Sequence, residues 1–222
     1  MKKIIILTIL IGSILTFLIY KYNYHEDMNI VALGDSVAMG QTAYNVVGYS
    51  YNDYLKDYFE HSSILNEYIT EFMDLEETSK TLLLKLQNNY TLESTNTSIT
   101  QAISKAKILT LSLGMNELNN KEEITTKIID EYLKNMDKIL KIFRIYNKKS
   151  IFVLSLYPTT KIDQEKTNII NNRLKELCDQ YQIHFVDISN IVQNKEYFFL
   201  PNNFYFNYKA HRFISEMIIE NC

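Results

Sequence analysis

Short apolar runs alternate along this chain with amphipathic segments, and this alternation constrains the fold more than any other feature. The runs have strand-like composition and lie at Met28–Leu33, Asn66–Phe72, Lys107–Leu113, Ser150–Leu156 and Ile183–Asp187. Parallel strands need long crossover connections, usually helices, which then cover both faces of the sheet. The sequence therefore predicts a three-layer α/β/α sandwich with a five-stranded, mainly parallel sheet.

Helical segments that join these runs are predicted from apolar residues recurring at helical spacing. They lie at Tyr51–Phe59, Glu77–Gln87, Ile99–Ala106, Lys121–Tyr146, Gln164–Tyr181 and Tyr208–Glu220. Because no internal repeat or Pro/Gly/Ser-rich linker interrupts them, residues 25–222 are expected to form one domain. A net charge of −3 without a basic stripe argues against a nucleic-acid partner.

The first 24 residues differ from the rest and are expected to form a membrane anchor with its flank. Residues 4–20 contain no charge and follow Lys2 and Lys3. At about 1.5 Å per residue, a helix of this length covers most of a bilayer. No small-x-small cleavage site and no lipoprotein cysteine precedes Tyr24. We therefore expect an uncleaved anchor that holds the domain outside the cytoplasm.

Two loops that follow predicted strands carry the candidate reactive residues. Gly34-Asp35-Ser36 follows the first strand, and Gly114-Met115-Asn116-Glu117 follows the third. Ligands of parallel α/β sheets bind beyond the carboxyl ends of the strands, so these loops are expected to share one pocket. A serine on a tight strand-to-helix turn exposes its hydroxyl, and nearby amides can stabilise an oxyanion. The spacing therefore favours Ser36 as a nucleophile.

These two blocks resemble those of the SGNH, or GDSL-type, hydrolase family. Gly34-Asp35-Ser36 is similar to its nucleophile block, and Gly114-Met115-Asn116-Glu117 to its Gly-x-Asn-Asp block. The resemblance extends over most of residues 25–222 and implies a flavodoxin-like sandwich. It also implies that Ser36 attacks an acyl ester, that Asn116 donates to the oxyanion, and that Gly34, Asp35 and Gly114 shape the turns. It implies no metal and no other cofactor.

The family's second block, a glycine after the second strand, is missing here. No glycine lies between Gly48 and Gly114, and Glu71 or Glu76 occupies the slot, depending on the alignment. A carboxylate beside a developing oxyanion opposes its charge unless the side chain turns away or is protonated. One oxyanion donor is therefore in question.

The family's last block, Asp-x-x-His, is altered at both functional positions. Asn202 stands in place of the aspartate and Tyr205 in place of the histidine. A phenol is protonated at neutral pH, so it would donate to Ser36 where a base must accept its proton. His211, six residues after Tyr205, is the remaining candidate for the base, and packing is the alternative. The other histidines, expected to be structural or on the surface, are His25, His61 and His184.

The sequence therefore allows two functions. The first is a membrane-anchored SGNH-type hydrolase that faces the cell envelope and acts on acyl esters through Ser36. The alternative is a catalytically inactive protein of the same fold that binds an envelope glycan, lipid or protein. Tyrosines between Tyr44 and Tyr58 either form a platform at the pocket mouth or pack on the sheet. The thiols of Cys178 and Cys222 are expected to be unpaired.

Overall fold

The computed structural model describes residues 28–199 and 205–222. The predicted anchor at residues 4–20, together with His25 and Asn202, lies outside the described residues. Within the described part, none of the helices combines the length and apolar character needed to cross a membrane.

Five strands form a single sheet in the order β2-β1-β3-β4-β5, and all neighbouring pairs are parallel. The strands are β1 (Met28–Gly34), β2 (Leu65–Ile69), β3 (Ile108–Ser112), β4 (Ser150–Leu154) and β5 (His184–Val186). This order is that of flavodoxin-like doubly wound sheets. The predicted fold class is therefore confirmed.

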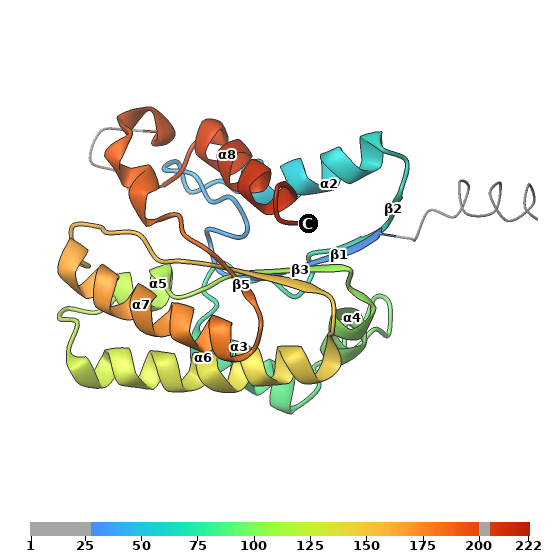
Figure 1. Cartoon of the computed structure of the whole chain (residues 1–222), viewed down its shortest axis with the longest axis horizontal. Coiled ribbons are helices and arrows are strands. Elements are labelled where there is room, and N and C mark those ends of the chain that lie inside the picture. Colours follow the sequence, from blue (N-terminus) through green and yellow to red (C-terminus); the bar gives the residue numbers. More distant parts are fainter. Residues whose placement is uncertain (1–27, 200–204) are drawn as a thin grey trace, which may run out of the picture.

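Helices cover both faces of the sheet, which makes three layers (Figure 1). On one face α2 (Tyr51–His61) packs beside α8 (Tyr208–Ile219). The other face carries α3 (Ser79–Gln87), α4 (Ile99–Lys105), α6 (Thr126–Tyr146) and α7 (Gln164–Gln180). Three short elements were not predicted, because a single turn has no apolar periodicity. They are α5 (Met115–Asn119), η1 (Ser189–Gln193) and η2 (Lys195–Tyr197).

Some predicted bounds differ from the observed ones for local reasons. The helix predicted from Lys121 begins only at Thr126, because the Thr125 side chain caps it by accepting a hydrogen bond from the Ile128 N–H. The strand predicted at Asn66–Phe72 ends at Ile69, where the chain turns into a loop that extends to Thr78.

The central position of β1 explains both its composition and the place of the site. Residues Ile30 to Gly34 of β1 are buried, because helices cover this strand on both faces. The chain leaves β1 through α2 on one face to reach β2, and then crosses through α3 and α4 on the other face to reach β3. The carboxyl end of β1 therefore opens at the switch point between these connections, where ligands bind in such sheets.

Gly34 is expected to be intolerant of a side chain. Its φ is +133°, and a Cβ there would lie 1.9 Å from the Ser112 carbonyl oxygen on β3. Gly34→Ala should therefore lower the free energy of unfolding by more than about 3 kcal/mol, measured by urea denaturation. Gly48→Ala is the matched control, because its φ lies outside the left-handed region and its Cβ would lie 3.0 Å from the end of the Thr42 side chain and 3.4 Å from the Gly40 carbonyl oxygen. Equal stability of the two variants would contradict this account of the turn.

Candidate active site

Ser36 lies on the turn after β1, and backbone hydrogen bonds hold this turn against β3. The Asp35 N–H donates to the Ser112 carbonyl at 3.0 Å, and the Gln41 N–H donates to the Ser36 carbonyl at 2.9 Å. The side chain of Ser36 is only 2% exposed. Its hydroxyl and its own N–H have no hydrogen-bond partner among residues 28–199 and 205–222. Both groups are therefore available to a ligand.

The Asp35 carboxylate joins the two sequence blocks. Its Oδ1 accepts from the Val37 N–H at 3.1 Å, and its Oδ2 accepts from the Gly114 N–H, also at 3.1 Å. Burial raises the pKa of Asp35 to about 7, although the surrounding backbone N–H groups favour its charged form. One buried side chain thus fixes the turn after β1 against the turn after β3, as the sequence blocks suggested.

A small pocket opens beside the Ser36 hydroxyl. It is lined by Ser36, Val37, Gln41, Tyr157, Tyr205, Phe206 and His211. As bounded by the described residues, its volume is about 10 Å³, close to the least that holds one water molecule. The rings of Tyr157 and Phe206 form one wall, with centroids 4.4 Å apart. The pocket is therefore aromatic and narrow.

His211 is the one described histidine at this pocket, and its ring is held by a backbone donor. Its Nδ1 accepts a hydrogen bond from the Tyr51 N–H at 3.2 Å, and the ring stacks on Tyr51. Burial lowers the pKa of His211 to about 4, so the ring is neutral near pH 7. A neutral imidazole whose Nδ1 accepts carries its proton on Nε2. In this state His211 can donate toward the pocket but cannot accept.

Asn116 belongs to a second recess. Its Nδ2 donates to the Leu75 carbonyl, and it lines a cavity of about 370 Å³ with Glu76, Glu117 and Lys121. Glu117 accepts from both the N–H and the hydroxyl of Ser79, which fastens α5 to the start of α3. Ser36 does not line this recess. The structure therefore places Asn116 and Ser36 on adjoining turns but in different cavities.

The loop that replaces the missing glycine block is tied to the nucleophile turn. The Asp74 N–H donates to the Gly34 carbonyl at 3.2 Å. Of the two carboxylates proposed for the slot, Glu76 lines the recess around Asn116, whereas Glu71 folds back to accept from the Thr70 N–H. Of these two carboxylates, Glu76 therefore shares a cavity with Asn116.

Of the other residues singled out from the sequence, some line the Ser36 pocket and others lie away from it. Tyr205 lines the Ser36 pocket. Tyr51 is fully buried beneath α8, so it packs, whereas Tyr44 and Tyr49 are exposed. Both thiols are free, Cys178 in the core and Cys222 at the surface. His61, at the end of α2, and His184, on β5, lie outside the Ser36 pocket.

Sequence reasoning did not include Tyr157 in the site. Tyr157 is buried, and both burial and the charge of Asp35 hold the pKa of its phenol well above the usual value. It follows the carboxyl end of β4, a strand that neighbours β3, and this position could have signalled its role as a pocket wall. Among the described residues, no cluster of His, Cys, Asp and Glu is suited to a metal ion.

Comparisons with solved structures give the same architecture. The chain is similar to an acetylxylan esterase from Geobacillus stearothermophilus (TM-score 0.65, 11% identity, 89% of this chain and 95% of that chain covered). It is also similar to a lipase/acylhydrolase from Enterococcus faecalis (TM-score 0.64, 14% identity, 87% and 95% covered). An α/β hydrolase from the metagenome of Lake Arreo, Spain, has a TM-score of 0.63 and 14% identity, with 89% and 95% covered. At these identities the likeness concerns the fold.

A comparison with curated proteins gave no match. The family model for GDSL-like lipase/acylhydrolase matches residues 30–218, which include both turns, the Ser36 pocket, most of β1 and the other four strands of the sheet. The chain therefore belongs to the GDSL-like lipase/acylhydrolase family, of which it is a divergent member.

Proposed function

We propose that this GDSL-like domain hydrolyses short acyl esters through Ser36, and that residues 4–20 anchor it in a membrane with the domain outside the cytoplasm. The observation that carries the first part is that Ser36 lines a pocket and that its hydroxyl has no hydrogen-bond partner among the described residues. The anchor rests on the uncharged segment after Lys2 and Lys3.

The proposed reaction has two steps. Ser36 Oγ attacks the ester carbonyl carbon, the bond to the alcohol oxygen breaks, and the alcohol leaves with a proton as acyl-Ser36 forms. Water then attacks the acyl carbon, the bond from this carbon to Ser36 Oγ breaks, and the carboxylic acid leaves as Oγ regains a proton from the water. The Ser36 N–H, which has no partner among residues 28–199 and 205–222, is available to the oxyanion. The small pocket favours an acetyl group over a long acyl chain.

The proton of the Ser36 hydroxyl needs an acceptor. Among the described residues, His211 is the histidine that lines the pocket. To accept at Nε2, its ring must give up the bond from the Tyr51 N–H. Leaving a buried N–H unpaired costs about 1–3 kcal/mol, or roughly a factor of 5 to 150 in rate. The proposed hydrolase is therefore slow compared with enzymes that have a free histidine and an aspartate partner.

The Tyr51–His211 bond also favours a second candidate function. If His211 keeps its Nε2 proton, it packs α8 against α2 and takes no part in proton transfer. With Tyr205 at the position of the family's histidine, the domain would then bind an envelope glycan, lipid or protein at this pocket without turnover. The two functions differ in one measurable property, which is turnover that depends on Ser36.

Hydrolysis of 4-nitrophenyl acetate by the full chain tests the proposal. Ser36→Ala is expected to lower kcat/KM at least about a hundredfold, because the nucleophile is lost, and His211→Ala is expected to do the same. His61→Ala is the control, since this exposed side chain on α2 bonds to the Asp57 carbonyl and lies outside the Ser36 pocket. Equal rates for wild type and Ser36→Ala would instead support the inactive, ligand-binding candidate.

The neutral state of His211 has its own signature in the pH dependence of stability. Its pKa is lowered from 6.5 to about 4 in the folded protein, so the unfolded chain binds a proton first as the pH falls below 6.5. His211 therefore favours folding less at pH 5 than at pH 7. The cost of His211→Gln in free energy of unfolding should be about 2 kcal/mol smaller at pH 5 than at pH 7.

Burial raises the pKa of Asp35 to about 7. The contribution of Asp35 to the free energy of unfolding therefore falls as the pH rises, opposite to that of His211. Wild type and His211→Gln share this contribution of Asp35, so it cancels when the two are compared at the same pH. His61→Gln, at an exposed histidine outside the Ser36 pocket, is measured alongside as the control. A cost of His211→Gln that does not change with pH would mean that the pKa of the His211 ring is not lowered in the folded state.

A further inference from the structure

The second step of the proposed reaction needs a water molecule at the acyl carbon, so the residues at the opening of the Ser36 pocket matter. Most residues that line this pocket are buried, whereas Gln41 and Tyr205 are partly exposed. Among the described residues, Gln41 and Tyr205 therefore border the side of the pocket that faces solvent. Water that approaches acyl-Ser36 from this side passes the Gln41 side chain.

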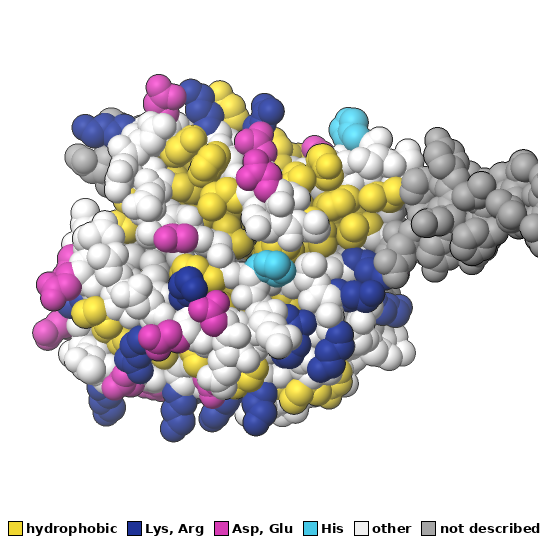
Figure 2. Space-filling view, in the orientation of Figure 1, with side chains coloured by type: hydrophobic (Ala, Val, Ile, Leu, Met, Phe, Trp, Pro, Cys, Tyr) yellow, Lys and Arg dark blue, Asp and Glu magenta, His cyan; other side chains and the backbone are white. Residues whose placement is uncertain are grey.

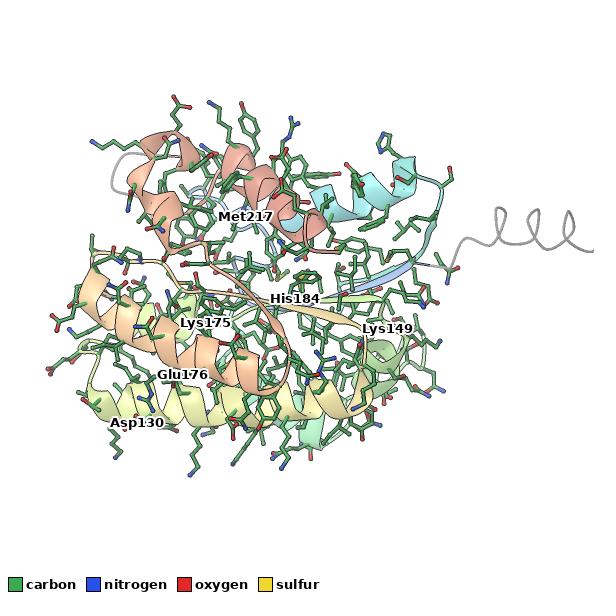
Figure 3. The ribbon with its side chains drawn as sticks, viewed as in Figure 1. Asp130, Lys149, Lys175, Glu176, His184 and Met217 are labelled. Atoms are coloured by element: carbon green, nitrogen blue, oxygen red, sulfur yellow. The ribbon has the colours of Figure 1, made fainter. Side chains whose placement is uncertain are left out.

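The pocket lies between the carboxyl end of β1 and the layer formed by α2 and α8. Figure 2 shows hydrophobic side chains, in yellow, gathered over α8 and α2. Figure 3 shows α8, which carries Met217, on the other side of the sheet from α6 and α7, which carry Asp130 and Lys175. In a site built on so apolar a layer, a few polar groups determine how a ligand is oriented.

A short hairpin holds the backbone of Gln41 beside Ser36. The Gln41 N–H donates to the Ser36 carbonyl at 2.9 Å, and Gln41 pairs with Val47 in an antiparallel bridge. Thr42 closes the turn, because its N–H and its hydroxyl both donate to the Val46 carbonyl at 2.9 Å. Backbone hydrogen bonds therefore fix the place of Gln41 relative to the nucleophile.

The side-chain amide of Gln41 has an acceptor that the hairpin does not use. Its Nε2 donates to Asn45 Oδ1 at 3.1 Å, which assigns the nitrogen to the side of Asn45. Its Oε1 accepts no hydrogen bond from residues 28–199 and 205–222. Since Gln41 lines the Ser36 pocket, this oxygen is available to a water molecule there.

We propose that Gln41 positions the water molecule that hydrolyses acyl-Ser36. This inference rests on the proposed function and adds a residue for its second step. The water donates one hydrogen to Gln41 Oε1, and this bond turns a lone pair of the water oxygen toward the acyl carbon. An amide oxygen is too weak a base to remove the proton, so Gln41 orients the water without activating it.

The atoms and protons of this step balance without a further reactant. The water oxygen forms a bond to the acyl carbon, and the bond from this carbon to Ser36 Oγ breaks. The hydrogen that Gln41 accepts stays on the carboxylic acid. The other hydrogen passes as a proton to Oγ, by way of His211 when that ring acts as the proposed base.

The first step of the reaction does not need the Gln41 amide. Attack of Ser36 on the ester involves no water, and the ester oxygen of the leaving alcohol has no hydrogen to donate to Gln41 before its bond breaks. Loss of the amide should therefore slow deacylation and leave acylation unchanged. A purely structural role for Gln41 in the hairpin would affect both steps, because both use Ser36.

The decay of acetyl-Ser36 in the full chain tests the inference. The protein is acetylated with 4-nitrophenyl acetate, the ester is removed, and the remaining acetyl-Ser36 is followed by intact-protein mass spectrometry. Gln41→Met keeps a long side chain but removes the amide. It is expected to slow the decay about tenfold, the size expected for one lost hydrogen bond to the reacting water. The rate of acetylation should stay within about twofold of wild type.

Thr42→Val is the matched control. It removes the hydroxyl that closes the same hairpin but keeps the Gln41 amide, so acetyl-Ser36 should decay as in wild type. Both variants should react with a small alkyl fluorophosphonate at the wild-type rate, because this reaction uses Ser36 and no water. That rate also shows whether the turn around Ser36 is intact in each variant.

Three outcomes would overturn the inference. Equal decay of acetyl-Ser36 in wild type and Gln41→Met would refute it and leave the proposed hydrolase standing. Slower decay in Thr42→Val, or acetylation slowed as much as decay in Gln41→Met, would assign the effect to the structure of the hairpin. A wild-type chain that forms no acetyl-Ser36 would refute the proposed hydrolysis and the inference together.

Discussion

The geometry of the site depends on the Asp35 carboxylate. It is fully buried, and it accepts hydrogen bonds from the backbone after β1 and from the backbone after β3. A buried carboxylate without such donors would be expensive, so these bonds hold the two turns at a fixed separation. The absence of a side chain at Gly34 allows the close approach to Ser112 that this separation requires. Ser36 is thus positioned by its neighbours, and its own hydroxyl remains available to a ligand.

The sequence was informative wherever a local pattern decides the structure. Buried strands and amphipathic helices gave the fold, and the rule that ligands bind beyond the carboxyl ends of strands located the turns at Ser36 and Gly114. Contacts between distant segments were not predictable. The tautomer of His211 is set by the Tyr51 N–H, 160 residues away, and the cavity around Asn116 forms where its side chain meets Leu75 in the loop after β2.

His211 shows how packing and chemistry compete within one side chain. The bond from Tyr51 and the contacts with Tyr51 and Phe206 stabilise the seam between α2 and α8. Burial at this seam lowers the pKa of His211, and the bond from Tyr51 places its proton on Nε2, the nitrogen that a general base needs free. Tyr205, which the sequence resemblance aligns with the family's histidine, lines the same pocket. The same architecture is therefore compatible with a slow hydrolase and with a protein that binds a ligand without turnover.

The central claim is that Ser36 is a reactive nucleophile, and covalent trapping tests it most directly. A small alkyl fluorophosphonate is incubated with the full chain, and the modified residue is found by peptide mass spectrometry. The serine oxygen displaces fluoride, so the account predicts a phosphonyl adduct on Ser36 that is absent from Ser36→Ala and present in His61→Ala. A folded protein that gains no adduct, or an adduct that persists in Ser36→Ala, would contradict the claim.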